Sequence, residues 1–147
     1  ARILTQAEEY ALENGLYAAI QTQGDPEDIT NAISAAACTT ARELGARAII
    51  ADTTTGTAAR RVSKQRPEQL IVAATPRVQT YHQLALSWGV VPLLTKPAQD
   101  VDELLESTIQ TAKAGGLIAA GDTVVMTAGA PLNVQGSTNM LKVEKVP

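Results

Sequence analysis

Hydroxyl-bearing residues with the potential to bind an anion gather in one short stretch of the chain. Four threonines surround a glycine there, as Thr53, Thr54, Thr55, Gly56 and Thr57. An apolar run at 48–51 precedes them and predicts a buried strand, and a helical pattern that ends at Pro67 follows. The first N–H groups of a helix have no partner within it, and the helix dipole places partial positive charge there. A strand, a hydroxyl-rich turn and a helix start therefore predict a phosphate site.

Three basic side chains, Arg60, Arg61 and Lys64, lie within two turns of this predicted helix and would add full positive charges. Gly56 would let the backbone approach a ligand closely or adopt a positive φ. The turn also has a simpler interpretation, because any helix that follows a strand needs an N-cap. The stretch lacks the Gly-Lys-Ser/Thr ending of a P-loop and the three glycines of a dinucleotide-binding turn. Phosphate binding and capping alone both remain open on this pattern.

The composition indicates one globular domain of the α/β class. The chain has 147 residues, which suits a single core. Aromatic residues make up only 3%, so Ala, Val, Ile and Leu must fill the core, as is typical of helices packed on a parallel sheet. The net charge of −3 argues against a nucleic-acid-binding surface. No apolar run approaches 18 residues, so neither a membrane span nor a signal peptide is predicted.

The single cysteine and the single histidine limit the possible chemistry. Cys38 cannot form an intrachain disulfide, which suits a reducing, cytoplasmic location. It lies in a predicted helix among small apolar residues, so we expect a structural thiol rather than a nucleophile. His82 falls on the polar side of another predicted helix and is expected to be solvated. These counts exclude a zinc site of His and Cys ligands, and we expect no cofactor or metal in this chain.

Hydrophobic periodicity divides the chain into an N-terminal arm, residues 1–24, and an α/β domain, residues 25–147. The arm is predicted to contain a helix over 5–12 and a polar linker. In the domain, Asp25 is predicted to be the N-cap of a helix that Gly45 ends. Apolar residues at spacings of three and four predict the inward face of this helix, formed by Ile29, Ala32, Ile33, Ala36, Thr40 and Leu44.

Strands and helices then alternate along the chain. Strands are predicted at 48–51, 70–74, 90–94, 123–126 and 140–146. A helix from Pro76 is expected to turn Val78, Tyr81, Leu84, Ala85 and Trp88 towards the core. A second amphipathic helix, starting at Asp100, is expected to bury Val101, Leu104, Leu105, Ile109 and Ala112. The alternation predicts a mostly parallel five-stranded sheet covered on both faces. Pro92 marks an edge or bulged strand, and the last strand should be an antiparallel edge because it follows a loop.

Threonine stands at the carboxyl end of four predicted strands, at Thr53, Thr75, Thr95 and Thr127. In open α/β sheets, ligands bind outside these ends, where the order of the strands reverses. The predicted phosphate turn therefore lies on the binding edge. We expect the loop from Gly129 to Gly136 to leave the same edge and to close over a ligand.

Several separated motifs resemble the C-terminal domain of pyruvate kinase. They are AISAAAC at 32–38, ARELGARAII at 41–50, TGTAAR at 55–60, VSKQRP at 62–67, GDTVV at 121–125 and TNMLKV at 138–143. The strands and turns follow the family's order over residues 1–147. The resemblance implies a three-layer α/β/α sandwich that is regulatory rather than catalytic.

The resemblance also implies where an allosteric effector binds. The family's effector-phosphate turn matches Thr53, Thr54, Thr55, Gly56 and Thr57. The loop that closes over the effector matches residues 128–136 and includes Gly129, Ala130, Pro131 and Gly136. The family's catalytic groups, with their Mg²⁺ and K⁺ sites, lie in a barrel domain absent from this chain. Whole enzymes of the family transfer phosphoryl from phosphoenolpyruvate to ADP in glycolysis, as tetramers in which this domain makes subunit contacts. The implied partners are thus a phosphorylated effector, the barrel domain and further copies of the chain.

One departure from the family bears on the effector. Members activated by fructose bisphosphate hold its second phosphate with an Arg early in the helix that follows Asp100 and with a Trp just before it. This chain has Leu104 and approximately Pro97 at those places. Charge-assisted contacts to phosphate are worth roughly 1.5–3 kcal/mol each. We therefore expect a monophosphate, either a sugar phosphate or AMP.

Two other functions remain open. The domain could serve subunit contact alone, with the effector turn unused. A freestanding phosphatase or phosphotransferase would need a base or nucleophile near the turn, where Asp52 is the candidate. No second carboxylate at metal-ligand spacing accompanies Asp52.

Overall fold

A five-stranded mixed sheet forms the centre of the protein. The computed structural model describes residues 2–14, 28–132, 134 and 136–147. The strand order is β3-β2-β1-β4-β5, with bounds β1 Ala48–Asp52, β2 Leu70–Thr75, β3 Val90–Leu94, β4 Thr123–Gly129 and β5 Thr138–Lys145. β1, β2, β3 and β4 are parallel, whereas β5 pairs antiparallel with β4. The predicted sheet is confirmed, including Pro92 in an edge strand and the antiparallel final strand.

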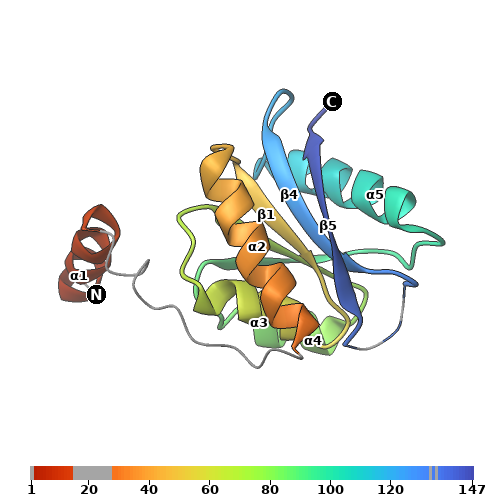
Figure 1. Ribbon diagram of the computed structural model, residues 1–147, viewed down its shortest axis with the longest axis horizontal. Helices are drawn as coiled ribbons and strands as arrows, with labels where there is room; N and C mark the ends of the chain where they lie inside the picture. Colours follow the sequence, from red (N-terminus) through yellow and green to blue (C-terminus); the bar gives the residue numbers. More distant parts are fainter. Residues whose placement is uncertain (1, 15–27, 133, 135) are drawn as a thin grey trace.

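Helices cover both faces of the sheet, so the predicted three-layer sandwich is also confirmed (Figure 1). The helices are α1 Arg2–Glu13, α2 Ile29–Glu43, α3 Thr57–Lys64, α4 Val78–Leu84 and α5 Val101–Ala114. α2, α3 and α4 pack on one face, and α5 packs on the other. α1 lies apart from these layers (Figure 1). Its Glu8 accepts a hydrogen bond of 3.2 Å from the Trp88 indole N–H.

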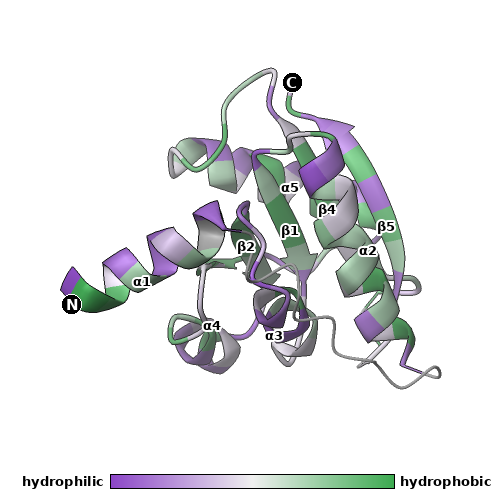
Figure 2. Cartoon of the chain, turned by 60° about the vertical axis from the view of Figure 1, so that its left-hand side comes forward, coloured by the Kyte–Doolittle hydropathy of each residue, from purple (hydrophilic) through white to green (hydrophobic). Residues whose placement is uncertain are grey.

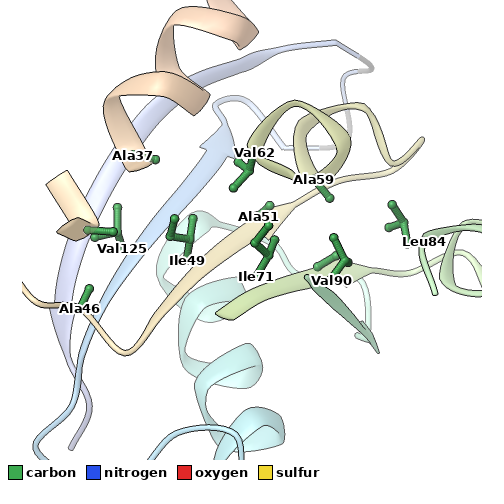
Figure 3. Packing of buried hydrophobic residues seen from close by; sticks show 12 residues of the cluster. Ala37, Ala46, Ile49, Ala51, Ala59, Val62, Ile71, Leu84, Val90 and Val125 are labelled. Carbon is green, nitrogen blue, oxygen red and sulfur yellow. The ribbon is translucent and has the colours of Figure 1, made fainter. Parts of the chain in front are cut away.

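Alternation along the strands divides the apolar side chains between two cores. Ile49 of β1 and Val125 of β4 point towards α2 and α3 (Figure 3), whereas Ile50 and Met126 pack against α5. The hydrophobic colours of Figure 2 concentrate on the central strands β1 and β2, between the helical layers. Burial of each branched side chain contributes about 1.5–3 kcal/mol, so these two cores hold the carboxyl ends of β1 and β4 side by side.

The inward face of α2 differs from the prediction. The buried residues are small and partly polar: Thr30, Ser34, Ala37 and Ala41. Ile29 and Leu44, predicted to face inward, are 62% and 52% exposed. Small side chains allow α2 to lie close to α3 and β5, and the Ser34 hydroxyl donates to the Thr30 carbonyl, which offsets the cost of burial. The larger apolar residues are left on the outer face of the helix.

The start of α2 also differs from the prediction. Asp25, the predicted N-cap, lies outside the described residues. The helix begins at Ile29, after the N-cap Asp28, whose side chain accepts from the Asn31 N–H at 2.9 Å. The second carboxylate oxygen of Asp28 forms an ion pair with Arg61 of α3. Asp28 therefore fixes the start of α2 against α3.

The predicted apolar faces of α5 and α4 have different outcomes. α5 was predicted to start at Asp100, which is its N-cap, and it buries Leu104, Leu105, Ile109 and Ala112 as expected. Val101, also expected to face inward, is half-buried. In α4 only Leu84 of the expected apolar residues is fully buried, and Val78 is 57% exposed. Within the described residues, no helix is both long and apolar enough to cross a membrane.

Candidate functional site

The carboxyl ends of β1 and β4 border a recess of about 30 Å³. The first side of its lining comes from the turn after β1, with Asp52, Thr53, Thr54, Thr55, Thr57 and Ala58. The opposite side comes from the β4–β5 segment and α2, with Gly129, Val134, Gly136, Ser137, Thr138 and Thr30. β2 and β3 lie on one side of β1, and β4 lies on its other side. The strand order therefore reverses at the recess. The structure thus brings together the two segments that the sequence placed on one edge.

Hydrogen bonds within the turn hold its threonines in place. The Thr53 hydroxyl oxygen accepts from the Gly56 N–H at 2.8 Å. The Thr53 N–H donates to the Ala74 carbonyl of β2 at 2.9 Å, which fixes the turn to the sheet. The hydroxyls of Thr55 and Thr57 lie 3.1 Å apart. Gly56 has a φ of 87°, a conformation that glycine adopts without steric cost.

The start of α3 leaves backbone donors without a partner in the helix. The first intrahelical bond runs from the Arg60 N–H to the Gly56 carbonyl, at 3.0 Å. The N–H groups of Thr57, Ala58 and Ala59 precede it and have no acceptor within the helix. The N-cap is Gly56, and no side chain caps α3. Thr57 and Ala58 line the recess, so their N–H groups are available to an anion there, whereas Ala59 is fully buried and lies outside the lining.

The predicted cations do not line the recess. The Arg60 residue is exposed; its guanidinium donates to the Thr55 carbonyl at 2.8 Å and lies next to Gly56. Arg61 pairs with Asp28, and Lys64 is exposed in the last turn of α3. The recess therefore offers neutral hydroxyl and N–H donors rather than full positive charges. Arg60 is near enough to support the turn from outside.

Asp52, at the end of β1, is the charged residue in the lining. Burial raises the pKa of its carboxyl to about 6, and a hydrogen bond from the Thr53 backbone partly offsets that rise. No described lysine or arginine forms a salt bridge with it. In the described part of the chain, no three acidic, histidine or cysteine side chains gather as a metal site would require. Asp52 thus stands alone as the candidate base of a freestanding enzyme.

The β4–β5 loop contributes Val134, Gly136 and Ser137 to the recess, and Gly129 at the end of β4 lines it too. Ala130 and Pro131 are exposed and lie outside the lining. A Cβ at Gly129 would lie 2.9 Å from the Ser137 carbonyl oxygen, so the close approach of the two loop ends requires glycine. The Asn139 side chain accepts from the Ala130 N–H at 3.0 Å and donates to its carbonyl at 2.9 Å. These bonds attach the loop to β5.

Sequence reasoning missed the lining residues Thr30, Ser137 and Thr138. Thr30 lies in the first turn of α2, and its inward orientation follows from the small-residue face that the periodicity did not favour. Thr138 begins β5, and an antiparallel partner of β4 must start at the edge where β4 ends. That last relationship could have been found from the predicted topology alone.

The remaining candidate groups play no part in the recess. Cys38 packs against the apolar core beneath α2, and burial raises the pKa of its thiol to about 12, slightly offset by Arg42. An unreactive thiol of this kind fits the structural role predicted for it. His82 is exposed on α4, as expected.

Comparisons with known proteins agree with this geometry. Residues 31–144 match the family described as "Pyruvate kinase, alpha/beta domain". A pyruvate kinase of Clostridium acetobutylicum is 38% identical over 143 residues, which cover 97% of this chain and 30% of that protein. One from Lactobacillus delbrueckii subsp. bulgaricus is 40% identical over 117 residues, 80% of this chain and 20% of that protein.

A solved structure gives the same result. The crystal structure of a pyruvate kinase from Cryptosporidium parvum superposes with a TM-score of 0.85 at 28% identity, over 99% of this chain and 28% of that one. The chain spans less than a third of the length of each of these relatives. It therefore belongs to the pyruvate kinase family and corresponds to the C-terminal α/β domain.

Proposed function

We propose that this chain is the regulatory domain of a pyruvate kinase and that it binds the phosphate of a metabolite in the recess beside β1. The observation that carries the proposal is the convergence of the uncapped start of α3 and the β4–β5 segment on one polar recess. The volume of about 30 Å³ suits a few water-sized groups, such as phosphate oxygens. The rest of the ligand would lie outside this recess.

The donors available suit a phosphate. The N–H groups of Thr57 and Ala58, which line the recess, carry the positive end of the α3 dipole, and hydroxyls of the turn and of Thr138 add further donors. Hydrogen bonds to a charged group contribute about 1.5–3 kcal/mol each. Two or three such bonds support binding in the micromolar to millimolar range, as is useful for sensing a metabolite.

The lining favours one phosphate rather than two. No lysine or arginine among the described residues lines this recess, and the buried carboxylate of Asp52 repels additional negative charge. Leu104, which stands in place of the family's arginine, is buried by packing on the sheet. These features support a sugar monophosphate or AMP over fructose bisphosphate.

The function of the whole protein follows from the family. A complete enzyme would contain the catalytic barrel with its Mg²⁺ and K⁺ sites and would transfer phosphoryl from phosphoenolpyruvate to ADP in the cytoplasm. The names of the matching relatives support this proposal. In that setting the recess would report the concentration of a metabolite to the barrel.

A thermal-shift screen of the chain tests effector binding. The ligands are ribose 5-phosphate, glucose 6-phosphate, AMP and fructose 1,6-bisphosphate, with inorganic phosphate and sodium chloride as references. A ligand at 100 times its Kd stabilises the folded state by about 2.7 kcal/mol, which raises Tm by several degrees. We expect a monophosphate to give the largest rise. Equal Tm values in all ligands at millimolar concentration would contradict the proposal.

The outer face of α2 supports a second role, in contact with another copy of the chain. Its exposed apolar residues include Ile29 and Leu44, with Ala32 and Ala36 between them. A row of small and apolar side chains on a helix face is suited to burial against a partner. This proposal agrees with the tetramers of the family and leaves the recess free for an effector.

Sedimentation of an Ile29→Lys variant tests this role. We expect the unmodified chain to form a dimer or larger species and the variant to sediment as a monomer. Leu86→Lys is the control, because Leu86 is 92% exposed on another part of the surface, beyond the end of α4. The same sedimentation coefficient for both variants and the parent would rule out the α2 face as the contact.

A further inference from the structure

A second recess lies at the same sheet edge, on the opposite side of β1. Asp52 and Thr54 line both recesses, so the two adjoin along the end of this strand. The second is also lined by Thr95 and Lys96, which follow β3, and by Leu104 of α5. Its volume is about 20 Å³. A ligand held in the first recess by its phosphate would therefore have its remaining atoms next to this second recess.

The shared carboxylate is the unusual feature of this arrangement. Asp52 is largely buried, and its raised pKa of about 6 comes from that burial. The groups that face it are the Thr53 backbone, the hydroxyls of the two linings and, at the rim of the second recess, the exposed Lys96. It forms no salt bridge with any described residue. A buried carboxylate of this kind favours a hydrogen-bond donor as its neighbour and disfavours a second anion.

The second recess also contains hydrogen-bond donors, one of which lacks a partner among the described residues. The Thr95 hydroxyl oxygen is buried and has no hydrogen-bond partner in the described part of the chain. Lys96 adds an ammonium with three N–H donors. Buried polar groups normally have a partner, so an unpaired hydroxyl at a recess points to a ligand or water that completes it. The recess thus combines an acceptor, Asp52, with donors at Thr95 and Lys96.

An alcohol hydroxyl matches both halves of this set, because it donates one hydrogen bond and accepts others. A phosphate there could accept from Lys96 and Thr95, but its negative charge would lie beside Asp52 without the N–H groups of α3 that line the first recess. An apolar group would leave the Thr95 hydroxyl and the carboxylate without partners. Among these three classes of ligand group, the hydroxyl alone satisfies every polar group in the lining.

We propose that the second recess is a hydroxyl subsite, in which Asp52 accepts a hydrogen bond from the sugar of a sugar monophosphate whose phosphate occupies the first recess. This inference rests on the proposed function and makes it more specific. It makes Asp52 the specificity-determining residue, which favours polyhydroxyl monophosphates and rejects bisphosphates.

Calorimetry at pH 8, where the carboxyl is ionised, tests the subsite with two probes. The probes are ribose 5-phosphate and inorganic phosphate, and the variant is Asp52→Ala. We expect the parent to bind ribose 5-phosphate at least tenfold more tightly than inorganic phosphate. A hydrogen bond to a charged group corresponds to roughly one to two decades in Kd. The variant should therefore lose about 10- to 100-fold in affinity for ribose 5-phosphate while it binds inorganic phosphate as tightly as the parent or more tightly.

Two further variants complete the test. Glu106→Ala is the charge-matched control, because Glu106 is exposed on α5 and lines neither recess; its affinities should equal those of the parent. Thr95→Val probes the subsite separately if Asp52→Ala does not fold, and it should weaken ribose 5-phosphate alone by about threefold or more. If the subsite variants that fold still prefer ribose 5-phosphate over inorganic phosphate as strongly as the parent does, the hydroxyl subsite is wrong. That result would leave the proposed phosphate site unaffected. No binding of either probe to the parent would overturn both proposals.

Discussion

The Gly56 N–H donates a 2.8 Å hydrogen bond to the Thr53 hydroxyl, and this bond closes the turn that carries the start of α3. Both residues are buried at the end of β1. The bond uses the N–H of the N-cap residue itself and leaves those of the first helical turn free. The relationship between Thr53 and Gly56 therefore determines which backbone donors are available to an anion.

Thr53→Val should open this turn. The substitution keeps the shape of the side chain but removes the acceptor, and an unsatisfied buried N–H costs about 1–3 kcal/mol. We expect that loss in the free energy of unfolding, measured in urea, and a loss of phosphate affinity in calorimetry. Thr53→Ser keeps the hydroxyl and should retain most of both. Equal unfolding free energies and equal phosphate affinities for the Val and Ser variants would show that this hydrogen bond does not hold the turn.

Gly56→Asp should abolish phosphate binding, because it places a carboxylate at the N-terminus of α3 where the anion would lie. Two unit charges about 4 Å apart repel by about 4 kcal/mol near a protein surface, enough to weaken binding well over tenfold. The control is Gly121→Asp: Gly121 has a φ of 89°, close to the 87° of Gly56, and open space around an added Cβ. It carries the same backbone strain and the same charge, and it differs in that a Cβ at Gly56 would also displace the flexible end of Arg60, 2.5 Å away. Equal phosphate affinities for the two variants, measured by calorimetry, would remove the turn as the site.

Asp28→Ala should destabilise the domain through two lost interactions. Asp28 caps α2 through the Asn31 N–H and pairs with Arg61 of α3. Loss of an N-cap costs about 1 kcal/mol, and the partly exposed ion pair adds roughly 0.2–1 kcal/mol. Asp28→Asn keeps a capping oxygen and should lose only the smaller amount. Urea unfolding of the three proteins should give the order parent, Asn, Ala; an Asn variant as unstable as Ala would show that the charge dominates.

Asp52→Asn should stabilise the protein at neutral pH. Burial raises the folded-state pKa from 3.8 to about 6, so the folded protein binds this proton more tightly than the unfolded chain does. The contribution of Asp52 to stability therefore falls as the pH rises from about 4 to 6, by up to about 3 kcal/mol. The Asn side chain does not ionise, so the variant does not lose stability over this pH range. Its advantage in urea unfolding should be largest at pH 7.5 and disappear near pH 4; an advantage independent of pH would contradict this account.

The sheet could be predicted closely from the sequence because its signals are local. Apolar runs such as 48–51, bounded by turn residues, mark buried strands, and the loop before β5 indicates an antiparallel return. The helix α5 was equally accessible, since Asp100 and an apolar face at regular spacing define it. These elements depend on neighbours in the sequence rather than on distant contacts.

The predicted inward face of α2 was wrong. Periodicity identifies an apolar face of a helix, but it does not show whether that face packs on the core or lies exposed on this chain. The larger residues, such as Ile29, point outward, and the small ones, such as Ala37, pack inward. Close packing of α2 on α3 and β5 selects small side chains there, and that requirement comes from elements far along the chain.

The turn after β1 could be predicted from the sequence, but the complete lining of the recess could not. The hydroxyl-rich run and Gly56 were visible directly, whereas the pairing of Arg61 with Asp28 depends on the approach of two helices. The contribution of Thr30 depends on the same approach. The position of Asp52 between two recesses likewise follows from the sheet order, which places β4 next to β1 on one side and β3 beyond β2 on the other.

The most direct test of the central claim is an NMR titration of the ¹⁵N-labelled chain with inorganic phosphate. The claim is that the free N–H groups at the start of α3 hold the anion. We predict that the amide signals of Thr57 and Ala58 move most, in saturable fashion, and that Gly56→Asp abolishes the shifts. Saturable shifts confined to another part of the chain, with these two amides unmoved, would contradict the account.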